Sequence, residues 1–165
     1  AASDVYKRQV LDVVGSGWWE DQLREYAAPH GDKVVFHGHV SEAYKHALLE
    51  RAAVHLLPSR KEGWGIAVIE AAQHGVPTVA YASAGGVADS IRDGETGRLV
   101  QPGEEFGQVV GETLGRREAM APAARKWAAR FSWEETGRRF ATIIGAPKLA
   151  QSSSCLLYTS DAADE

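Results

Sequence analysis

Two glutamates, eight positions apart, frame the stretch of this 165-residue sequence that has the most chemical character: "SRKEGWGIAVIEAAQHGVP", from Ser59 to Pro77. Glu62 comes just before a Gly-Trp-Gly turn, and Glu70 lies in the apolar run that follows it. We expect a helix to begin near Gly65. The unpaired backbone N–H groups and the dipole of a helix start favour an anion such as phosphate, and glycine lets the backbone approach that anion closely.

The spacing of the two carboxylates suits a nucleotide-sugar. A helix rises about 1.5 Å per residue, which places Glu62 and Glu70 on the order of 10 Å apart. This separation roughly spans a diphosphate with a sugar on each side, and carboxylates accept hydrogen bonds well from sugar hydroxyls. On spacing alone, the alternative is a surface Glu62 and a helix-face Glu70, because glutamate pairs of this spacing are common.

Two further chemistries compete for the same residues and their neighbours. A glycosidase would use Glu62 and Glu70 as acid and nucleophile across one sugar bond, at about 5–9.5 Å, and a phosphate-binding helix start between them fits that chemistry poorly. His37 and His39 in "FHGHV" would face one side of a strand as a metal pair. No third ligand is evident for such a pair, so structural or site-lining roles are the alternative, and we expect no metal.

The elements that must position these residues alternate between strand and helix. β-rich apolar runs predict strands over residues 10–14 (a buried strand), 33–38, 53–57, 76–82 and 97–103. Helical spacing predicts helices over 18–31, 41–52 with Ser41 as cap, 65–75 with Gly75 as C-cap, and 85–94. Residues 104–144 are predicted to be helical, with breaks near Pro122 and at Ser132, where "SWEE" offers a capping box.

This order predicts an α/β fold, a Rossmann-like parallel sheet with helices on both faces. Ligands of such sheets bind at the carboxyl ends of the strands, where the loop that carries Glu62 lies. We expect the large aromatic side chains Trp18, Trp19, Trp127 and Trp133 to pack in the core or between helices. His55 and His74 are expected to pack or to cap.

The segment around the two glutamates resembles the donor-binding signature of family 4 retaining glycosyltransferases, enzymes with two Rossmann domains (the GT-B fold). That signature is Glu-Gly-aromatic-Gly, a second Glu eight residues after the first, and a helix of small residues that ends in Gly-x-Pro. Here it is Glu62-Gly63-Trp64-Gly65, Glu70-Ala71-Ala72 and Gly75-Val76-Pro77. The resemblance extends in order through "LDVVGSG", "VVFHGHVS", "GGVADSIRDGETGRLVQPGEE" and "FSWEETGRRF", from about Val10 to Ile144.

The resemblance implies roles for the matching positions. Glu62 would be the catalytic residue, contacting the transferred sugar as the donor bond breaks, and Glu70 would hold the ribose hydroxyls. The remaining implied donor-binding positions are Gly63 and Trp64 in the signature, Gly65, Ile66 and Ala67 with backbone N–H groups toward the diphosphate, and His39 and Val40 near the base. Further candidates are Lys61, Gly15, Gly17, Gly85 and Gly86.

The implied activity is glycosyl transfer in carbohydrate biosynthesis, from a nucleotide-sugar to an unknown acceptor (a sugar, lipid or glycan), with retention of configuration. The nucleotide-sugar is a substrate, so no cofactor is expected. Asp89 stands where many members have Glu, and Trp64 where many have Phe. The family's Arg and Lys that neutralise the diphosphate belong upstream of this sequence, so a non-catalytic nucleotide-sugar-binding fragment is the alternative.

Both ends of the sequence look foreign to the domain. One short DNA sequence encodes residues 1–9, and its reverse complement encodes much of 155–165. This DNA sequence resembles a transposase adapter used in DNA library preparation. We therefore expect adapter-derived residues at 1–9 and 155–165, a tail at 146–154, and an incomplete donor-binding domain at 10–145 that lacks its first strand. The sequence would then be a bacterial metagenomic fragment, inactive on its own.

The composition of the chain argues against several classes of partner and of location. The formal net charge is −4, and a chain of this charge gives no reason to expect nucleic-acid binding. The single cysteine, Cys155, lies in the second adapter-like segment, so no disulfide framework is expected. No apolar run approaches the roughly 18 residues of a membrane span. We expect a cytoplasmic protein, and a peripheral association of the full-length protein with the inner membrane stays open.

Overall fold

The computed structural model describes residues 9–145. The predicted adapter-derived ends and the tail at 146–154 fall almost entirely outside this range. The chain divides into two compact units, Ala1–Ala128 and Ala129–Glu165. The predicted alternation of strands and helices occupies the first unit.

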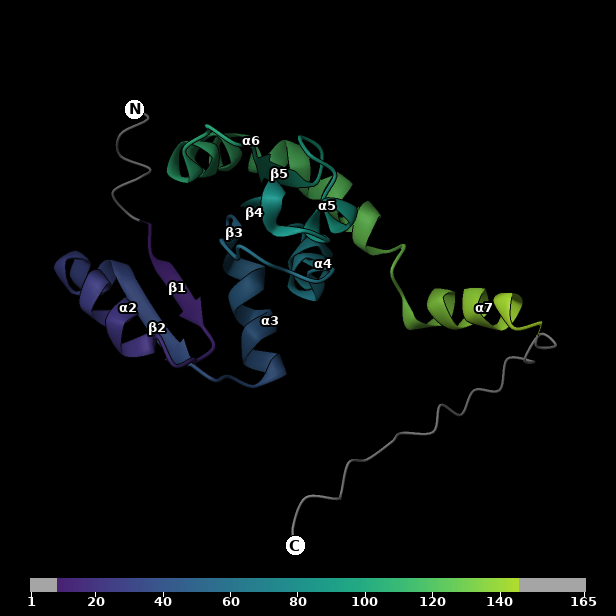
Figure 1. The fold of residues 1–165 in the computed structure, drawn as a ribbon, viewed down its shortest axis with the longest axis horizontal. Coiled ribbons are helices and arrows are strands. Elements are labelled where there is room, and N and C mark those ends of the chain that lie inside the picture. Colours follow the sequence, from purple (N-terminus) through teal and green to yellow (C-terminus); the bar gives the residue numbers. More distant parts are fainter. Residues whose placement is uncertain (1–8, 146–165) are drawn as a thin grey trace, which may run out of the picture. The chain divides into compact units, whose positions relative to one another are not determined.

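The strands of the first unit pair in parallel and form two sheets. One sheet has the order β1-β2 and the other the order β3-β4-β5, as Figure 1 shows. The bounds of the strands are Leu11–Val14 for β1, Val34–Gly38 for β2, His55–Leu57 for β3, Thr78–Tyr81 for β4 and Gly97–Val100 for β5. Each lies within or close to a predicted strand, so the α/β pattern is confirmed.

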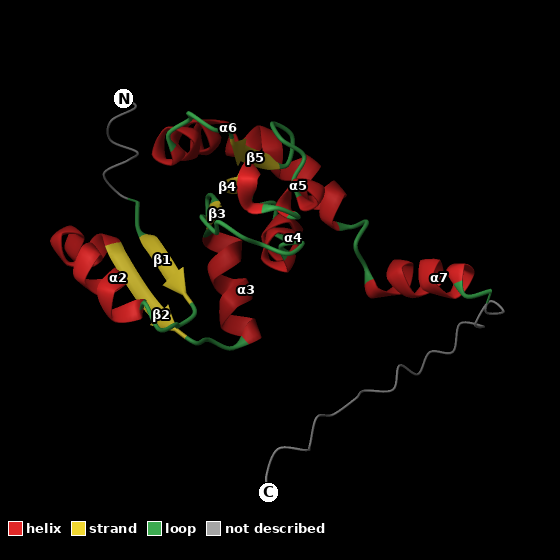
Figure 2. Cartoon of the chain, in the orientation of Figure 1, coloured by secondary structure: helices red, strands yellow, loops and turns green. Residues whose placement is uncertain are grey.

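Helices connect the strands, as parallel pairing requires, and Figure 2 distinguishes the two kinds of element. The helices are α2 (Glu20–Ala27), α3 (Glu42–Arg51), α4 (Ile66–Gln73), α5 (Val87–Ser90), α6 (Phe106–Ala128) and, in the second unit, α7 (Trp133–Ile143), with 3-10 turns at Ala28–Lys33 and Ala82–Ala84. The cap signals in the sequence are confirmed. The side chains of Ser41 and Ser132 accept from the backbone N–H groups of Tyr44 and Glu135, and Gly75 has φ +75° just after α4.

The predicted break near Pro122 is wrong, because α6 runs through it without interruption. Proline in a helix interior removes one backbone hydrogen bond and crowds the preceding turn. Met120 and Ala124, on either side of Pro122, are buried. We attribute the continuity of α6 to this packing, because it offsets the free-energy cost of a proline inside the helix.

The core of the first unit lies around the sheet β3-β4-β5. One buried cluster joins α4, β4, α5 and β5, and a second joins β4, β5 and α6. Its members are Val68, Ala80, Ala84, Val87, Ile91 and Leu99 in the first cluster, and Val79, Val100 and Val109 in the second. The loop with Glu62 and the helix with Glu70 are therefore anchored on the best-packed part of the unit.

The prediction of a buried strand over residues 10–14 is wrong in its burial. Leu11 and Val14 are each 43% exposed. A strand of a parallel sheet is buried when it has neighbours on both edges and layers on both faces. Within residues 9–145, β1 has only β2 as a neighbouring strand.

The tryptophans also differ in burial, some packing against the protein and others standing in solvent. Trp127 packs as predicted, because its Nε1–H donates to the Ser90 carbonyl at 2.8 Å and the Arg92 guanidinium lies 4.2 Å from its ring centre. Trp18 and Trp133 are 87% and 88% exposed, so the packing prediction is wrong for both. They stand at the starts of α2 and α7, helices that bury none of their own residues.

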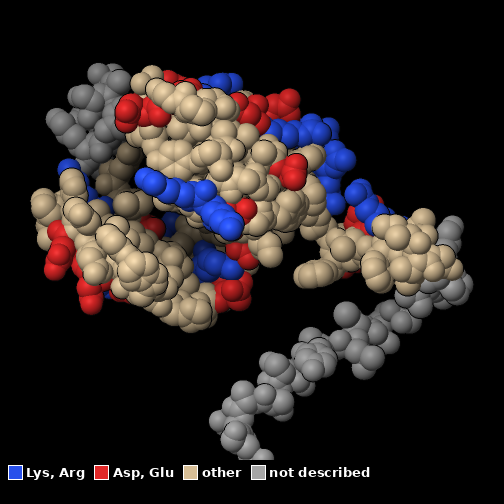
Figure 3. Space-filling view, in the orientation of Figure 1, with Lys and Arg blue, Asp and Glu red and all other residues tan. Residues whose placement is uncertain are grey.

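The surface mixes both signs of charge. Acidic and basic side chains both occur on the face shown in Figure 3. Among the helices of the described residues, none is both long and apolar enough to cross a membrane.

Candidate active site

The loop that carries Glu62 is locked to the loop after β4. The Glu62 N–H donates to the Ala84 carbonyl at 2.7 Å, and Glu62 forms an isolated parallel bridge with Gly85. A Cβ on Gly86 would lie 1.8 Å from the Gly63 carbonyl oxygen, and one on Gly85 would lie 3.1 Å from that of Glu62. Only glycine allows the two backbones to approach this closely. Gly85 and Gly86, predicted as site candidates, therefore support the backbone of Glu62.

Gly65 turns the chain into α4 with φ +78°, a conformation that favours glycine. It is buried, and a Cβ there would lie 3.1 Å from the Val68 side chain and 3.4 Å from the Ser90 hydroxyl. Gly65 has no side chain to cap α4, and the first N–H groups of a helix have no partner within it. Ile66, the first residue of α4, is 69% exposed. The predicted anion position is thus an uncapped helix start near the surface.

Glu70 lies inside α4 and is held by a residue that the sequence interpretation missed. The Lys45 Nζ is 2.9 Å from the Glu70 Oε1 and 2.8 Å from the Glu42 Oε2. Lys45 belongs to α3, which begins just after the predicted base-contacting residues His39 and Val40. In the sequence, Lys45 looks like one half of a surface pair with Glu42 three residues before it, and nothing local indicates Glu70.

The turn after β1 meets the end of β2. The Gly15 N–H donates to the Gly38 carbonyl at 2.7 Å, and both glycines have positive φ. His39 follows Gly38 and is exposed, whereas Val40 is half-buried. The structure thus brings the predicted Gly15–Gly17 turn next to the predicted base-contacting loop.

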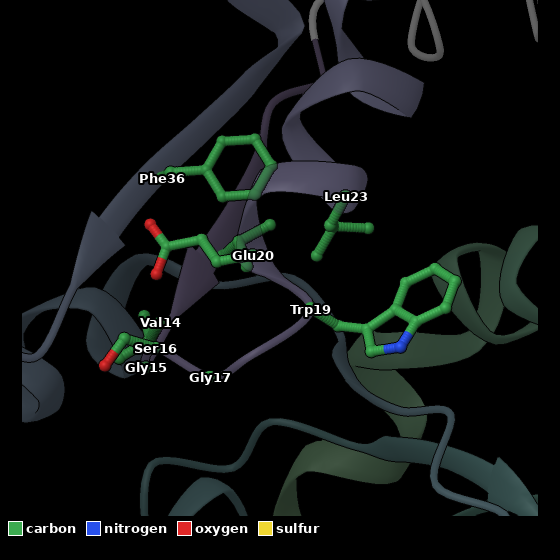
Figure 4. Close-up of a pocket in the computed structure, with 9 residues that line it drawn as sticks. Val14, Gly15, Ser16, Gly17, Trp19, Glu20, Leu23 and Phe36 are labelled. Carbon is green, nitrogen blue, oxygen red and sulfur yellow. The ribbon is translucent and has the colours of Figure 1, made fainter.

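A hollow of about 270 Å³ opens at the carboxyl end of β1. Figure 4 shows Trp19, Leu23 and Phe36 around it, with the Gly15–Gly17 turn on one side. Its lining includes the candidates Gly15 and Gly17 but neither Glu62 nor Glu70. The hollow therefore belongs to the β1 side of the unit, and the two glutamates lie elsewhere.

His37, one of the two histidines considered as a metal pair, contacts two side chains of the protein. The His37 Nε2 is 2.7 Å from an Asp12 carboxylate oxygen, and its Nδ1 is 3.3 Å from the Tyr44 hydroxyl. Both ring nitrogens of His37 are thus engaged. Among residues 9–145, no group of three or more His, Cys, Asp or Glu side chains is placed to hold a metal ion.

The packing role predicted for His55 and His74 is confirmed. Desolvation by the surrounding protein lowers the pKa of His55 to about 4, and the charge of nearby Glu70 partly opposes this shift. The His55 Nδ1 lies 3.0 Å from the Thr78 hydroxyl. His74 meets His46 through ring nitrogens 2.8 Å apart.

The candidate residues therefore form separate contacts. Glu62 and Gly63 lie against Gly85 and Gly86, and Glu70 lies against Lys45. Within residues 9–145, no hydrogen bond or ion pair joins the Glu62 carboxylate to Glu70 or to any other side chain. Lys61 is exposed and Trp64 is 37% exposed, both beside Glu62 in the loop.

Comparison with known proteins identifies related sequences. The family model "Glycosyl transferases group 1" matches residues 1–127. A D-inositol 3-phosphate glycosyltransferase of Geodermatophilus obscurus is 38% identical over 87 residues, which are 52% of this chain and 19% of that protein. A GDP-mannose-dependent alpha-(1-6)-phosphatidylinositol monomannoside mannosyltransferase of Mycolicibacterium smegmatis is 32% identical over 157 residues, 86% of this chain and 41% of that protein.

Solved structures share the fold. The pneumococcal O-GlcNAc transferase GtfA, solved with UDP and GlcNAc, superimposes with a TM-score of 0.71 at 24% identity over 87% of this chain and 30% of its own. This likeness places the chain among GT-B folds, as the sequence predicted. The family match begins at residue 1 and so includes residues 1–9, whose adapter origin stays a prediction. The chain spans between 19% and 41% of the length of the two curated relatives above.

Proposed function

The chain belongs to the glycosyl transferases group 1 family, and from that membership we propose that its parent protein transfers a sugar from a nucleotide-sugar to an acceptor. The transfer retains the anomeric configuration, as in family 4, and this chain supplies the donor-binding half. The observation that carries the proposal is the Glu62–Gly63 backbone, locked against Gly85–Gly86 at the uncapped start of α4.

The diphosphate of the donor binds at the start of α4. The backbone N–H groups of Gly65, Ile66 and Ala67 point toward it, and the helix dipole adds a favourable interaction of about 0.3–1 kcal/mol. The positive φ of Gly65 supports this role, because it turns the chain so that α4 begins close to the loop of Glu62. Lys61, exposed in the same loop, adds positive charge beside the phosphates.

Glu62 contacts the transferred sugar. Its carboxylate makes no ion pair within residues 9–145, so its oxygens are available to sugar hydroxyls, and its backbone is held in place by Ala84. The bond from the anomeric carbon to the diphosphate breaks and its electron pair stays on the diphosphate. The acceptor oxygen bonds to the same face of that carbon, and its proton passes to an oxygen of the departing diphosphate. Positioning and charge stabilisation supply most of the rate acceleration.

The nucleoside occupies the other side of the site. Glu70 accepts hydrogen bonds from the ribose hydroxyls, and His39 and Val40 lie near the base, beside the Gly15–Gly17 turn. Gly63 and Trp64 complete the donor pocket. The nucleotide-sugar is the substrate, and the domain requires neither a metal nor a cofactor.

The names of related proteins support a nucleotide-sugar without selecting one. One curated relative is named as GDP-mannose-dependent, and one structural neighbour was solved with UDP. The acceptor is a sugar, lipid or glycan bound by the part of the parent protein outside this chain. We place the reaction in the cytoplasm, where nucleotide-sugars are available, with the parent protein free to associate with the inner membrane.

A second candidate is a nucleotide-sugar-binding fragment without catalysis. It is favoured by the contrast between the two glutamates: Lys45 holds the carboxylate of Glu70, whereas no side chain within residues 9–145 forms an ion pair with that of Glu62. Both candidates require Glu70 and the start of α4 to bind the donor, and they differ only in whether Glu62 takes part in a reaction.

The test uses the purified chain with UDP-, GDP- and ADP-glucose. We expect one of the three to bind by calorimetry, and Glu62→Ala to weaken that binding by about tenfold, the cost of removing a hydrogen bond to a charged group. Glu25→Ala, which removes an exposed glutamate of α2, serves as the control and leaves binding unchanged. If none of the three nucleotide-sugars binds, the donor-binding role proposed for this chain is wrong.

A transfer assay separates the two candidates. The chain is incubated with each radiolabelled nucleotide-sugar and a panel of sugar, lipid and glycan acceptors. Label transferred above the Glu62→Ala background would overturn the non-catalytic candidate. In the full-length parent enzyme, the same substitution should abolish most turnover, and activity within a few-fold of wild type would contradict the role given to Glu62.

A further inference from the structure

Lys45 joins two helices through one ammonium group. Its Nζ donates to the Glu42 carboxylate at 3.0 Å and to the Glu70 Oε1 at 2.9 Å. Glu42 belongs to the same helix, α3, whereas Glu70 lies 25 residues further along, in α4. The Lys45 side chain is therefore the direct link between α3 and the carboxylate to which we assign the ribose.

The burial of the three groups is unequal. The Lys45 and Glu70 side chains are 24% and 25% exposed, whereas the Glu42 side chain is 77% exposed. A partly buried ion pair is less screened by water and salt than a surface pair. The pKa of Lys45 is raised, first by the hydrogen bond to Glu42 and also by the one to Glu70, against the opposing effect of desolvation. The charged form of Lys45 is thus favoured at the contact with Glu70.

The contact uses one side of the Glu70 carboxylate. Lys45 engages Oε1, and within residues 9–145 no hydrogen bond reaches Oε2. A carboxylate offers about four acceptor positions over its two oxygens. Lys45 can therefore fix the rotation of the Glu70 side chain while Oε2 stays open to a ligand hydroxyl.

We propose that Lys45 is a positioning residue for ribose recognition, which holds the Glu70 carboxylate so that it accepts hydrogen bonds from the 2′- and 3′-hydroxyls of the nucleotide. This inference rests on the proposed function. Because only Ser41 separates Val40 from the start of α3, Lys45 also ties the ribose carboxylate to the helix that follows the base-contacting loop. The residues near the base and the lysine that holds the ribose carboxylate then lie on one continuous stretch of chain, the loop and the helix α3 that follows it.

The experiment compares a nucleotide with its deoxy counterpart. The probe is whichever of UDP, GDP and ADP binds the chain most tightly, with its 2′,3′-dideoxy form as the partner ligand. The wild-type chain should prefer the ribose form by about tenfold, the value of one or two hydrogen bonds to a charged acceptor. In Lys45→Met this preference should fall to about twofold, while affinity for the dideoxy form changes by less than about twofold.

Two controls isolate the contact. Lys126→Met removes an exposed lysine of α6 and should keep the full ribose preference, which excludes an effect of net charge. In a Glu70→Gln background, Lys45→Met should cause no further loss of preference, because a residue that acts through Glu70 has nothing left to position. Thermal unfolding of each variant shows whether the fold is retained.

The outcomes separate this inference from the proposed function. If Lys45→Met keeps the ribose preference, or weakens both ligands equally, Lys45 does not position Glu70 for the ribose. If the wild type shows no preference, or Glu70→Gln keeps it, the ribose role of Glu70 itself is wrong, and the inference on Lys45 is overturned with it.

Discussion

The region from β1 to β2 and the region from β3 to β5 share one strand–helix–strand pattern but bury it to different depths. In the second region, Val79 and Ala80 of β4 have no exposed surface, because β4 lies between β3 and β5. In the first region, α2 buries none of its residues and β1 has one strand neighbour within residues 9–145. The pattern of apolar residues therefore determines which strands and helices form. The number of neighbouring elements determines whether their side chains are buried in the core.

The candidate site residues are distributed over both regions, which differ in burial. Glu62 and Glu70 stand on the well-packed region, where glycines and a lysine fix their surroundings. The Gly15–Gly17 turn and the hollow beside it belong to the open region. Donor contacts on the packed side should therefore be sensitive to small changes of volume, and those on the open side should tolerate them.

The largest expected effect comes from adding one methyl group to each side. Gly86→Ala would place a Cβ 1.8 Å from the Gly63 carbonyl oxygen, whereas a Cβ on Gly17 meets nothing within 4 Å. We expect Gly86→Ala to reduce the free energy of unfolding by about 3 kcal/mol or more, and Gly17→Ala by about 0.5 kcal/mol or less. Urea unfolding of both variants measures this, and equal losses would contradict the contrast.

Side-chain truncation should rank the two regions in the same order. We expect Val79→Ala in β4 to cost about 2–3 kcal/mol of unfolding free energy, through the lost burial and the cavity left behind. Leu11→Ala in β1 removes a larger side chain that is 43% exposed and should cost about 1 kcal/mol. Denaturant unfolding again gives the comparison. A greater loss for Leu11→Ala would show that β1 is covered in solution.

His55 places a titratable group in the packed region. Its pKa of about 4 lies below the ordinary value of 6.5, so between these values the unfolded chain binds a proton that the folded chain does not. Stability should therefore be fully present above about pH 6.5 and fall as the pH drops toward 4, by about 3 kcal/mol from this group. His55→Gln should unfold with a weaker dependence across this window. An unchanged dependence would exclude His55 as the source.

The smallest effect is expected at the ion pairs of Lys45. The hydrogen bond to Glu42 raises the pKa of Lys45 most, and the one to Glu70 raises it less. Glu42→Gln should therefore lower the pKa of Lys45 more than Glu70→Gln does, in a titration followed by NMR of the lysine side chain. The reverse order would mean that Glu70 dominates the contact in solution.

Much of the fold was predictable from local signals. Gly75 after the small-residue helix, Ser41 and Ser132 at helix starts, and β-branched runs each act through their own backbone, so the sequence alone indicates them. Burial was not predictable in this way. Val14 looks like a core residue until the count of neighbouring strands is known, and Pro122 looks like a break until the packing of Met120 and Ala124 is seen.

The candidate site follows the same rule. The loop of Glu62 and the helix of Glu70 were located because glycines and carboxylates mark them in the sequence, and their roles stay predictions. The contact of Lys45 with Glu70 depends on how α3 packs against α4, which no spacing within either helix reveals. The support that Gly86 gives to Gly63 likewise becomes visible only when the two loops are seen together.

The two sheets have a consequence for how the molecule behaves among copies of itself. Every strand except β4 carries one side whose backbone N–H and C=O groups pair with no strand in residues 9–145. Such rows act as templates for strands of other molecules. Self-association through them would run through the main chain, grow with protein concentration and respond little to salt. Dilution, rather than ionic strength, would then be the variable that prevents such pairing.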